Sequence, residues 1–143
     1  MKISSKGRYA LAVLTSMAKH EGIGKLVSVV NLSERLGISK IYLEQVFSLL
    51  KRGGLVVSVK GASGGYYLKK PPNEITTYEV LSATESALFE KPEAIISKQD
   101  ENLERSINET VFIPLDDAIH NALSGISIDD IMNKSGEDHM YHI

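Results

Sequence analysis

Polar side chains recur on one side of a helix that the sequence predicts over residues 39–52. The set holds two cations, an amide, a hydroxyl and one apolar residue, and it contains no acid. Its members are Lys40, Ile41, Gln45, Ser48 and Arg52. Side chains of this kind donate to and accept from base edges and phosphate oxygens. The chemistry that they favour is recognition of nucleic acid.

The opposite side of the same helix is apolar. Its residues recur at i, i+3, i+4 and i+7, which is the spacing of a single buried stripe on a helix: Leu43, Val46, Phe47 and Leu50. Ser39 is a suitable N-cap, and Gly53 with Gly54 ends the helix. We therefore expect one face to pack against a core and the polar face to remain accessible.

A second helix is predicted just before it, over residues 28–36. Ser28 caps this helix, and Gly37 stops it because glycine accepts the left-handed conformation that ends helices. The apolar side consists of Val29, Val30, Leu32 and Leu36. Ile38 fills the turn between the two helices.

Two strands joined by a glycine-rich loop are predicted after the second helix. Residues 55–59 and 66–69 are rich in β-branched and aromatic side chains, whereas residues 60–65 hold too much glycine to continue a strand. Two helices around a tight turn, followed by a hairpin with a basic tip, form a winged helix-turn-helix. The predicted fold class is mainly α with a small β wing.

The charge of the chain is divided between its two halves. Residues 1–70 hold 12 Lys and Arg against 3 Glu, a net charge of +9, whereas residues 71–143 hold 4 against 15 acids, a net charge of −11. The basic half carries the helix-turn-helix pattern, which favours double-stranded DNA as the partner. The alternative is a winged-helix module that docks on another protein. Binding to DNA would weaken steeply with salt, and this separates the two.

A further helix, capped by Ser4 or Ser5, is predicted over residues 6–20. Its inward side is Tyr9, Ala10, Val13, Leu14 and Met17. Three cations gather at its beginning: Lys2, Lys6 and Arg8. Cations at a helix N-terminus oppose the helix dipole, so we expect phosphate contact to favour them there. The alternative is a solvated helix terminus without a partner.

The acidic half begins after Pro71 and Pro72. We expect residues 1–72 to form the winged domain and residues 73–143 a helical region for dimerisation and regulation. Thr76 or Thr77 caps a short helix there, with Val80, Leu81 and Ala83 as its apolar content. Residues 86–99 have no clean period and are predicted to be mostly loop.

A long helix is predicted over about residues 100–123. Its apolar stripe is Leu103, Ile107, Val111, Leu115, Ile119 and Leu123. A stripe of this length finds more partner surface in a second copy of the chain than in one small core, so a homodimer is expected; packing within the chain is the alternative. Pro114 requires a kink or a fresh start near Ile113. A short helix over residues 128–132 and a polar tail over residues 135–143 complete the chain.

Composition excludes several function classes. The chain has no cysteine, and therefore no disulfide, thiolate zinc site or Cys-ligated iron–sulfur cluster. No apolar run approaches the ~20 residues of a membrane helix, and no signal peptide is evident, so a cytoplasmic protein without membrane contact is expected. No histidine has a nucleophile or an orienting carboxylate in a catalytic motif, which argues against an enzyme. His139 and His142 have a spacing that suits a metal, but a flexible terminus does not favour one, so no metal or cofactor is predicted.

Three blocks of sequence resemble the Rrf-two family of winged-helix transcription regulators. They are MKISSKGRYA at residues 1–10, IS followed by YLEQ at residues 38–45, and GLV, KG and GGY between residues 54 and 66. The resemblance implies a sequence-specific repressor that binds a pseudo-palindromic operator as a homodimer. It also implies contacts in the major groove by Ser39, Tyr42, Glu44 and Gln45.

The resemblance also assigns the hairpin. Lys60, where the family usually has arginine, is implied to enter the minor groove beside Gly61; lysine lacks the planar fork, so shape reading is expected to be weaker. We add Ser63 in the same loop and Ser28 at the preceding helix cap to the candidate DNA contacts.

The chain departs from many family members in its sensor. Cluster-binding members carry three cysteines in a region corresponding to about residues 86–100, and this chain has none. It therefore resembles the branch that works without a cluster, of which CymR is the known type. In that relative the C-terminal tail is implied to bind O-acetylserine sulfhydrylase, so Tyr141, His142 and Ile143 are candidate partner contacts. The alternative is a disordered tail.

Overall fold

The computed structural model describes residues 2–85, 87–90 and 100–141, with side chains up to residue 136. In chain order the elements are α1 (Ser5–His20), α2 (Val29–Leu36), α3 (Lys40–Arg52), β1 (Val56–Val59), β2 (Gly65–Leu68), the 3-10 turn η1 (Pro72–Glu74), α4 (Thr77–Thr84), α5 (Glu101–Ile107), the π-helical turn η3 (Asn108–Phe112), α6 (Ile113–Ser124) and α7 (Ile128–Tyr141). The predicted class, mainly α with a small β wing, is confirmed.

The helix-turn-helix forms where local signals place it. The backbone N–H of Asn31 donates to Ser28 Oγ at 3.1 Å, and that of Tyr42 donates to Ser39 Oγ at 3.2 Å. Gly37 ends α2 with φ 67°, a left-handed conformation that is costly for residues with a side chain. Both caps and the stop were predicted from the sequence, and all three are confirmed.

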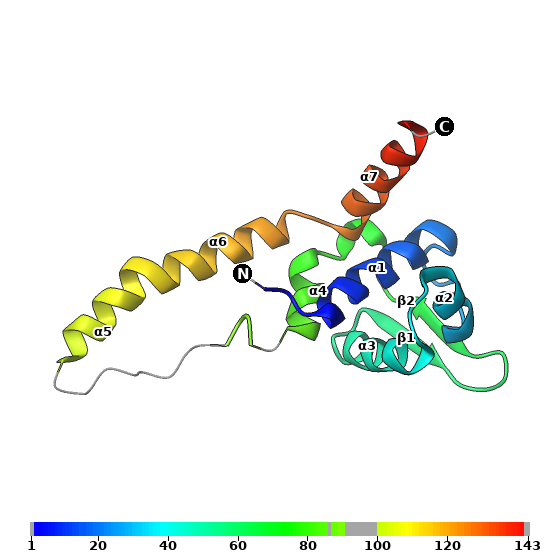
Figure 1. Cartoon of the computed structure of the whole chain (residues 1–143), viewed down its shortest axis with the longest axis horizontal. Helices are drawn as coiled ribbons and strands as arrows, with labels where there is room; N and C mark the ends of the chain where they lie inside the picture. Colours follow the sequence, from blue (N-terminus) through cyan, green and yellow to red (C-terminus); the bar gives the residue numbers. More distant parts are fainter. Residues whose placement is uncertain (1, 86, 91–99, 142–143) are drawn as a thin grey trace.

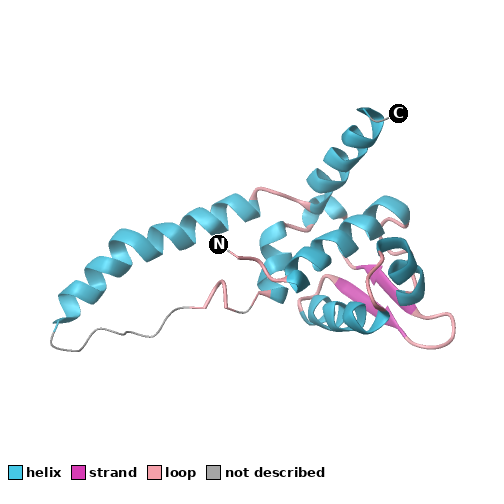
Figure 2. Ribbon diagram, viewed as in Figure 1, coloured by secondary structure: helices cyan, strands magenta, loops and turns pink. Residues whose placement is uncertain are grey.

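The wing is a two-stranded antiparallel sheet. Val56 pairs with Leu68 and Val59 with Gly65, and the segment before α2 adds a further bridge between Val27 and Tyr66. Figure 2 shows this small sheet among the helices, with the loop between its strands projecting outward. The wing is thereby tied to the start of α2 as well as to α3.

One hydrophobic core joins α1, α3 and the wing. All four predicted stripe residues of α3 are fully buried, as are Ala10, Val13, Leu14 and Met17 of α1. The rings of Phe47 and Tyr66 stack with centroids 4.1 Å apart and planes 6° apart, which fastens α3 to β2. The face of α3 opposite this core is left for solvent.

Two apolar residues predicted to face inward are exposed instead. Val30 is 48% exposed and lies beside the wing loop. Tyr9 is also exposed, but its ring meets that of Tyr42 edge-on, with centroids 5.1 Å apart. Aromatic rings pack favourably at a surface when they contact each other in this way.

The same core continues beyond residue 72. Ile75, Val80 and Ile128 belong to the cluster that contains Leu14 and Phe47. Thr76 caps α4 by accepting from the backbone N–H of Glu79 at 3.1 Å. The acidic half therefore contributes its first helix, and the start of its last, to the packing of the basic half.

The long helix is continuous through Pro114 because a π-helical turn precedes it. The backbone N–H of Ile113 donates to the carbonyl of Asn108, five residues back, and α6 begins at Ile113. Proline tolerates this position because a first helical turn needs no N–H from it. The predicted fresh start near Ile113 is not found as a break: the helical stretch changes to a π-helical turn over Asn108–Phe112 and returns to an α-helix at Ile113. Figure 1 shows α5, η3 and α6 projecting away from the core.

The last helix is longer than expected. Its cap is reciprocal, as Ser127 N–H donates to Asp130 Oδ2 at 2.8 Å and Asp130 N–H donates to Ser127 Oγ at 3.1 Å. It continues to Tyr141, where the sequence had suggested an end near Met132 and a polar tail. Polar residues without proline allow a helix to continue, so polarity alone was a poor stop signal.

Some predicted segments lie outside the described residues. Most of the predicted loop over residues 86–99 is among them, and so are His142 and Ile143. None of the described helices has the length and apolar character needed to cross a membrane.

Candidate nucleic-acid interface

The polar face of α3 forms an exposed ridge. Lys40, Glu44, Gln45 and Ser48 are exposed along it, and Ile41, near its N-terminal end, is 73% exposed. The helix is held rigidly from behind by its fully buried stripe. A rigid helix with an uncovered polar face is what entry into a major groove requires.

A groove separates this ridge from the wing on one side, and we call it the wing groove. Lys40, Glu44 and Lys51 line it from α3, and Lys60 with Gly61 lines it from the wing loop. Its remaining lining residues are Ser28, Val29, Val30, Ser58, Val59, Ala62, Gly64, Gly65 and Tyr66. The three lysines outnumber the single acid, Glu44, so the groove has a net positive charge that attracts phosphate.

A second groove lies on the other side of the ridge, and we call it the arm groove. Lys6 of α1 borders it together with Ile41, Glu44, Gln45 and Ser48 of α3, and Leu49 completes it. Residues 6 and 45 are far apart in the sequence, yet their elements lie side by side. The structure thus brings a cation from the start of α1 next to the amide at the centre of the ridge.

Several predicted site residues lie outside both grooves. Lys2 and Arg8 are exposed near the start of α1, and Ser63 is exposed in the wing loop. Arg52 is exposed at the last turn of α3, about 18 Å along the helix from Lys40. Tyr42 is half-buried against Tyr9, so only part of its ring faces outward.

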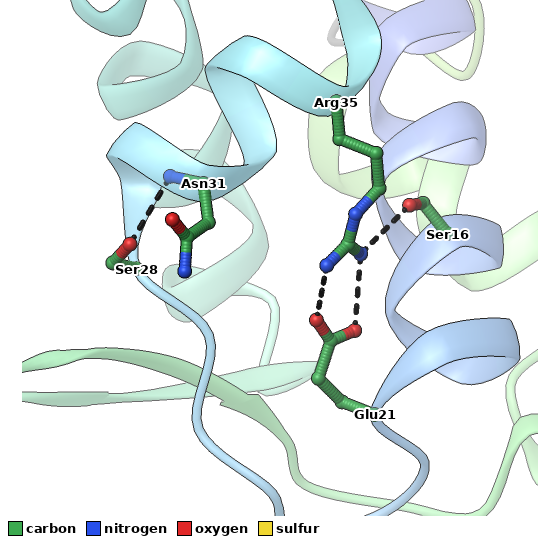
Figure 3. Close-up of polar contacts among 5 residues, drawn as sticks. All are labelled: Ser16, Glu21, Ser28, Asn31 and Arg35. Atoms are coloured by element: carbon green, nitrogen blue, oxygen red, sulfur yellow. Dashed lines mark hydrogen bonds and ion pairs between the residues drawn. The ribbon is translucent and has the colours of Figure 1, made fainter.

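An ion pair joins α2 to the end of α1 (Figure 3). Arg35 donates to both carboxylate oxygens of Glu21, at 2.6 and 3.1 Å, and to Ser16 Oγ at 3.1 Å. The hydrogen bond to Glu21 raises the pKa of the Arg35 guanidinium above its ordinary value, and its partial burial acts in the opposite direction. Arg35 is therefore a structural cation of the basic half.

A second cation is also ion-paired. Lys70 contacts the carboxylate of Glu79, which belongs to the acidic half. The net charge of the basic half therefore overstates the charge available to a nucleic acid.

Sequence reasoning missed Lys51 in the wing groove. Lys40, Glu44 and Lys51 are spaced by four and seven residues, and such residues share one side of a helix. That spacing was a usable signal. Val59 was missed as well, and nothing in an alternating strand indicates which side will face a neighbouring helix.

Two glycines of the wing, Gly64 and Gly65, lie too close to neighbouring backbone to carry a side chain. A Cβ on Gly64 would lie 2.2 Å from the carbonyl oxygen of Val59, and one on Gly65 would lie 2.1 Å from that of Val27. These two glycines allow the wing loop to close tightly and to lie against the start of α2.

Comparison with known proteins identifies the chain. The model of the Rrf2 family, described as an iron-dependent transcriptional regulator, matches residues 3–134. The chain belongs to the Rrf2 family. This Rrf2 chain is thereby a DNA-binding transcription regulator and not an enzyme, as the sequence predicted, and the protein-docking alternative is set aside.

Individual relatives agree with this assignment. The chain is 38% identical over 133 residues to the HTH-type transcriptional regulator IscR of Pectobacterium atrosepticum, covering 93% of this chain and 80% of the relative. It is similar in structure to CymR, the global cysteine regulator of B. subtilis, with a TM-score of 0.70, 30% identity and coverage of 94% and 98%. It is also similar to the IscR of T. potens, with a TM-score of 0.71, 29% identity and coverage of 99% and 96%.

Proposed function

We propose that this Rrf2 regulator binds a pseudo-palindromic operator as a homodimer and represses transcription by blocking access to a promoter. The ridge of α3 would enter the major groove, with Ser39, Tyr42, Glu44 and Gln45 near the bases. Lys60 would lie in the adjacent minor groove. The observation that carries this proposal is the uncovered ridge between two grooves, each bordered by lysine.

The proposal of a homodimer rests on an exposed apolar stripe. Leu103, Val111 and Leu115 are 48%, 51% and 49% exposed, although α5, η3 and α6 form the longest continuous helical stretch described. Apolar surface of this extent is unfavourable in water unless a partner covers it. A second copy would present the same stripe, and a two-fold axis would also place two α3 ridges on successive major grooves.

The π-helical turn supports the same use of the stripe. A repeat of four residues drifts around a helix of 3.6 residues per turn. A π-helical turn holds more residues than an α-helical turn, so η3 partly corrects that drift between Ile107 and Leu115. The stripe therefore stays nearer to one side of the helix than an uninterrupted α-helix would keep it.

We infer that regulation does not use a thiolate-ligated cluster. The family description is iron-dependent, but the chain has no cysteine to hold an iron–sulfur cluster. Within the part of the chain that the structure describes, no group of three His, Asp or Glu residues could hold a metal ion. The donor set therefore does not fit an iron–sulfur cluster, and the signal is proposed to be of another kind.

A narrower proposal concerns Tyr141, His142 and Ile143. By the likeness to CymR, we propose that they contact O-acetylserine sulfhydrylase. The course of α7 supports this, since it carries the chain away from α3 and the wing (Figure 1). Pull-down of that enzyme by the wild-type protein and by an Ile143→Ala variant tests the proposal, and equal recovery would contradict it.

Genome-wide footprinting of the bound protein, followed by footprinting of recovered fragments with purified protein, tests the main proposal. We expect two related half-sites whose centres are about 10 base pairs, or a multiple of that, apart. Protection of a single isolated half-site would contradict binding as a symmetric dimer. The positions of the sites relative to promoters test repression.

A further inference from the structure

Glu85, the C-cap residue of α4, contacts the start of α1 through its side chain. Glu85 accepts from the backbone N–H of Ser4 at 3.0 Å and from its hydroxyl at 2.6 Å. Ser4 is itself the N-cap of α1, and its Oγ accepts from the backbone N–H of Gly7 at 3.3 Å. One carboxylate from the acidic half thus organises the start of the most N-terminal helix.

Gly7 leaves room for this carboxylate. A Cβ at position 7 would lie 2.3 Å from Glu85 Oε1 and 2.8 Å from Ile3 Cγ2. Glycine is unfavourable inside a helix compared with alanine, and Gly7 does not have the positive φ that would otherwise require it. Its place in the first turn of α1 is explained by the close approach of Glu85.

The charges in the first turn of α1 also favour a carboxylate from another element. The first turn of α1 contains no acid, while Lys6 and Arg8 lie near the positive end of its dipole. Glu85 supplies from another element the negative charge that the local sequence lacks. Lys6 is half-buried and borders the arm groove beside Gln45, so its position depends on where α1 begins.

We propose that Glu85 is a positioning residue for DNA binding: by holding Ser4, it keeps Lys6 beside the recognition ridge, where Lys6 contacts phosphate. This inference rests on the proposed binding of DNA by the α3 ridge and on the phosphate contact that the sequence predicts for Lys6. It also links that role to the long helix, since α4 contacts α6 directly. The hydroxyl of Thr77 donates to the carbonyl of Leu123 at 2.7 Å, and Tyr78 meets His120 with ring centroids 4.4 Å apart.

The direction of the change in DNA affinity when Glu85 is replaced distinguishes a role in positioning Lys6 from the removal of a negative charge alone. Removal of a carboxylate near a DNA-binding face strengthens binding if only charge matters, and it does so equally for alanine and glutamine replacements. Positioning predicts a split, because the amide oxygen of glutamine still accepts a hydrogen bond from Ser4 whereas alanine accepts none.

The experiment measures the affinity of full-length protein for a random-sequence duplex of about 30 base pairs over a range of salt concentrations. The proteins are wild type, Glu85→Ala, Glu85→Gln, Lys6→Ala and the double variant Glu85→Ala with Lys6→Ala. We expect Glu85→Ala to bind about 3- to 10-fold more weakly and to lower the slope of log K against log salt by about one, as one lost phosphate contact does. Glu85→Gln is expected to stay at or above wild-type affinity.

The double variant is expected to bind no more weakly than Lys6→Ala. A purely structural loss lowers the melting temperature and the active fraction, but it leaves the salt slope unchanged. Gly7→Ala displaces Glu85 without changing any charge and is expected to reproduce the lower slope.

Two outcomes overturn different claims. A wild-type slope for Glu85→Ala, together with a lower slope for Lys6→Ala, overturns this inference and leaves the phosphate role of Lys6 intact. A wild-type slope for Lys6→Ala overturns that phosphate role, and this inference with it.

Discussion

At the scale of single residues, the interface combines side chains that can read bases with side chains that can only attract phosphate. Gln45 lies at the centre of the ridge and borders the arm groove. Lys60 lies across the wing groove from Lys40 and Lys51. An amide offers a paired donor and acceptor, whereas an ammonium is a point charge, so the two positions should respond differently to substitution.

Gln45→Ala is expected to reduce discrimination at one operator position by about 1–3 kcal/mol, because a glutamine amide can hydrogen bond two atoms of an adenine. Fluorescence anisotropy on the operator and on duplexes with single base-pair changes measures this. Glu34→Ala is the control, since Glu34 is exposed on α2 and borders neither groove. Unchanged preference among the operator duplexes would refute base reading by Gln45.

Lys60→Ala is expected to weaken binding to all sequences to a similar extent and to lower the salt slope by about one, because a phosphate-directed cation carries little base information. Lys19→Ala removes the same charge from the far end of α1, outside both grooves, and should leave the slope near wild type. Lys60→Arg is expected to favour duplexes with a narrow minor groove. A loss confined to one base position would contradict this role for Lys60.

At the scale of elements, the helix-turn-helix is fastened to α1 by Arg35. Glu21 and Ser16 both lie on or just after α1, and the side chains of Arg35 and Glu21 are only 28% and 13% exposed. A partly buried, two-pronged pair of this geometry is more stabilising than an ordinary surface salt bridge.

Arg35→Ala is expected to lower the free energy of unfolding by about 1–2 kcal/mol, because it leaves Glu21 and Ser16 without their shared donor. Urea unfolding at neutral pH measures the loss, and Lys19→Ala on α1 is the control. Since the folded state raises the pKa of Arg35, the contribution of the charged guanidinium is fully present below the ordinary arginine pKa and is lost as the pH rises through the raised pKa. Equal stability of Arg35→Ala and wild type would show that the pair does not stabilise the fold.

At the scale of the whole molecule, the basic face formed by α3 and the wing is separate from the acidic long helix formed by α5, η3 and α6. This long helix projects from the core (Figure 1), and its apolar stripe is exposed to solvent. If a second copy covers this stripe, operator affinity depends on the dimer as well as on α3.

Leu115→Glu is expected to weaken self-association by at least about 100-fold, because a carboxylate would be buried against its own copy across a two-fold axis. Sedimentation equilibrium measures the association constant. Asp116→Asn is the control, since Asp116 is adjacent and exposed but is not one of the six stripe residues. A Leu115→Glu protein that dimerises as tightly as wild type would exclude this face as the dimer interface.

Much of the fold could be predicted because its signals are local. The caps at Ser28 and Ser39, the stop at Gly37 and the buried stripe of α3 each depend on residues within about one or two helical turns. Family membership followed from short blocks of sequence in the same region. The polar set on α3 was identified in the same way, since the side opposite a buried stripe must face outward.

Only the tertiary structure determined which side chains from different elements come into contact. Sequence could not indicate that Lys6 would border Gln45 or that Arg35 would be held by Glu21. Glu85 and Ser4 are 81 positions apart, and only the path of the chain brings them within hydrogen-bonding distance. Helical period and capping act over a few residues, whereas the partner of a charged side chain is set by the packing of whole elements.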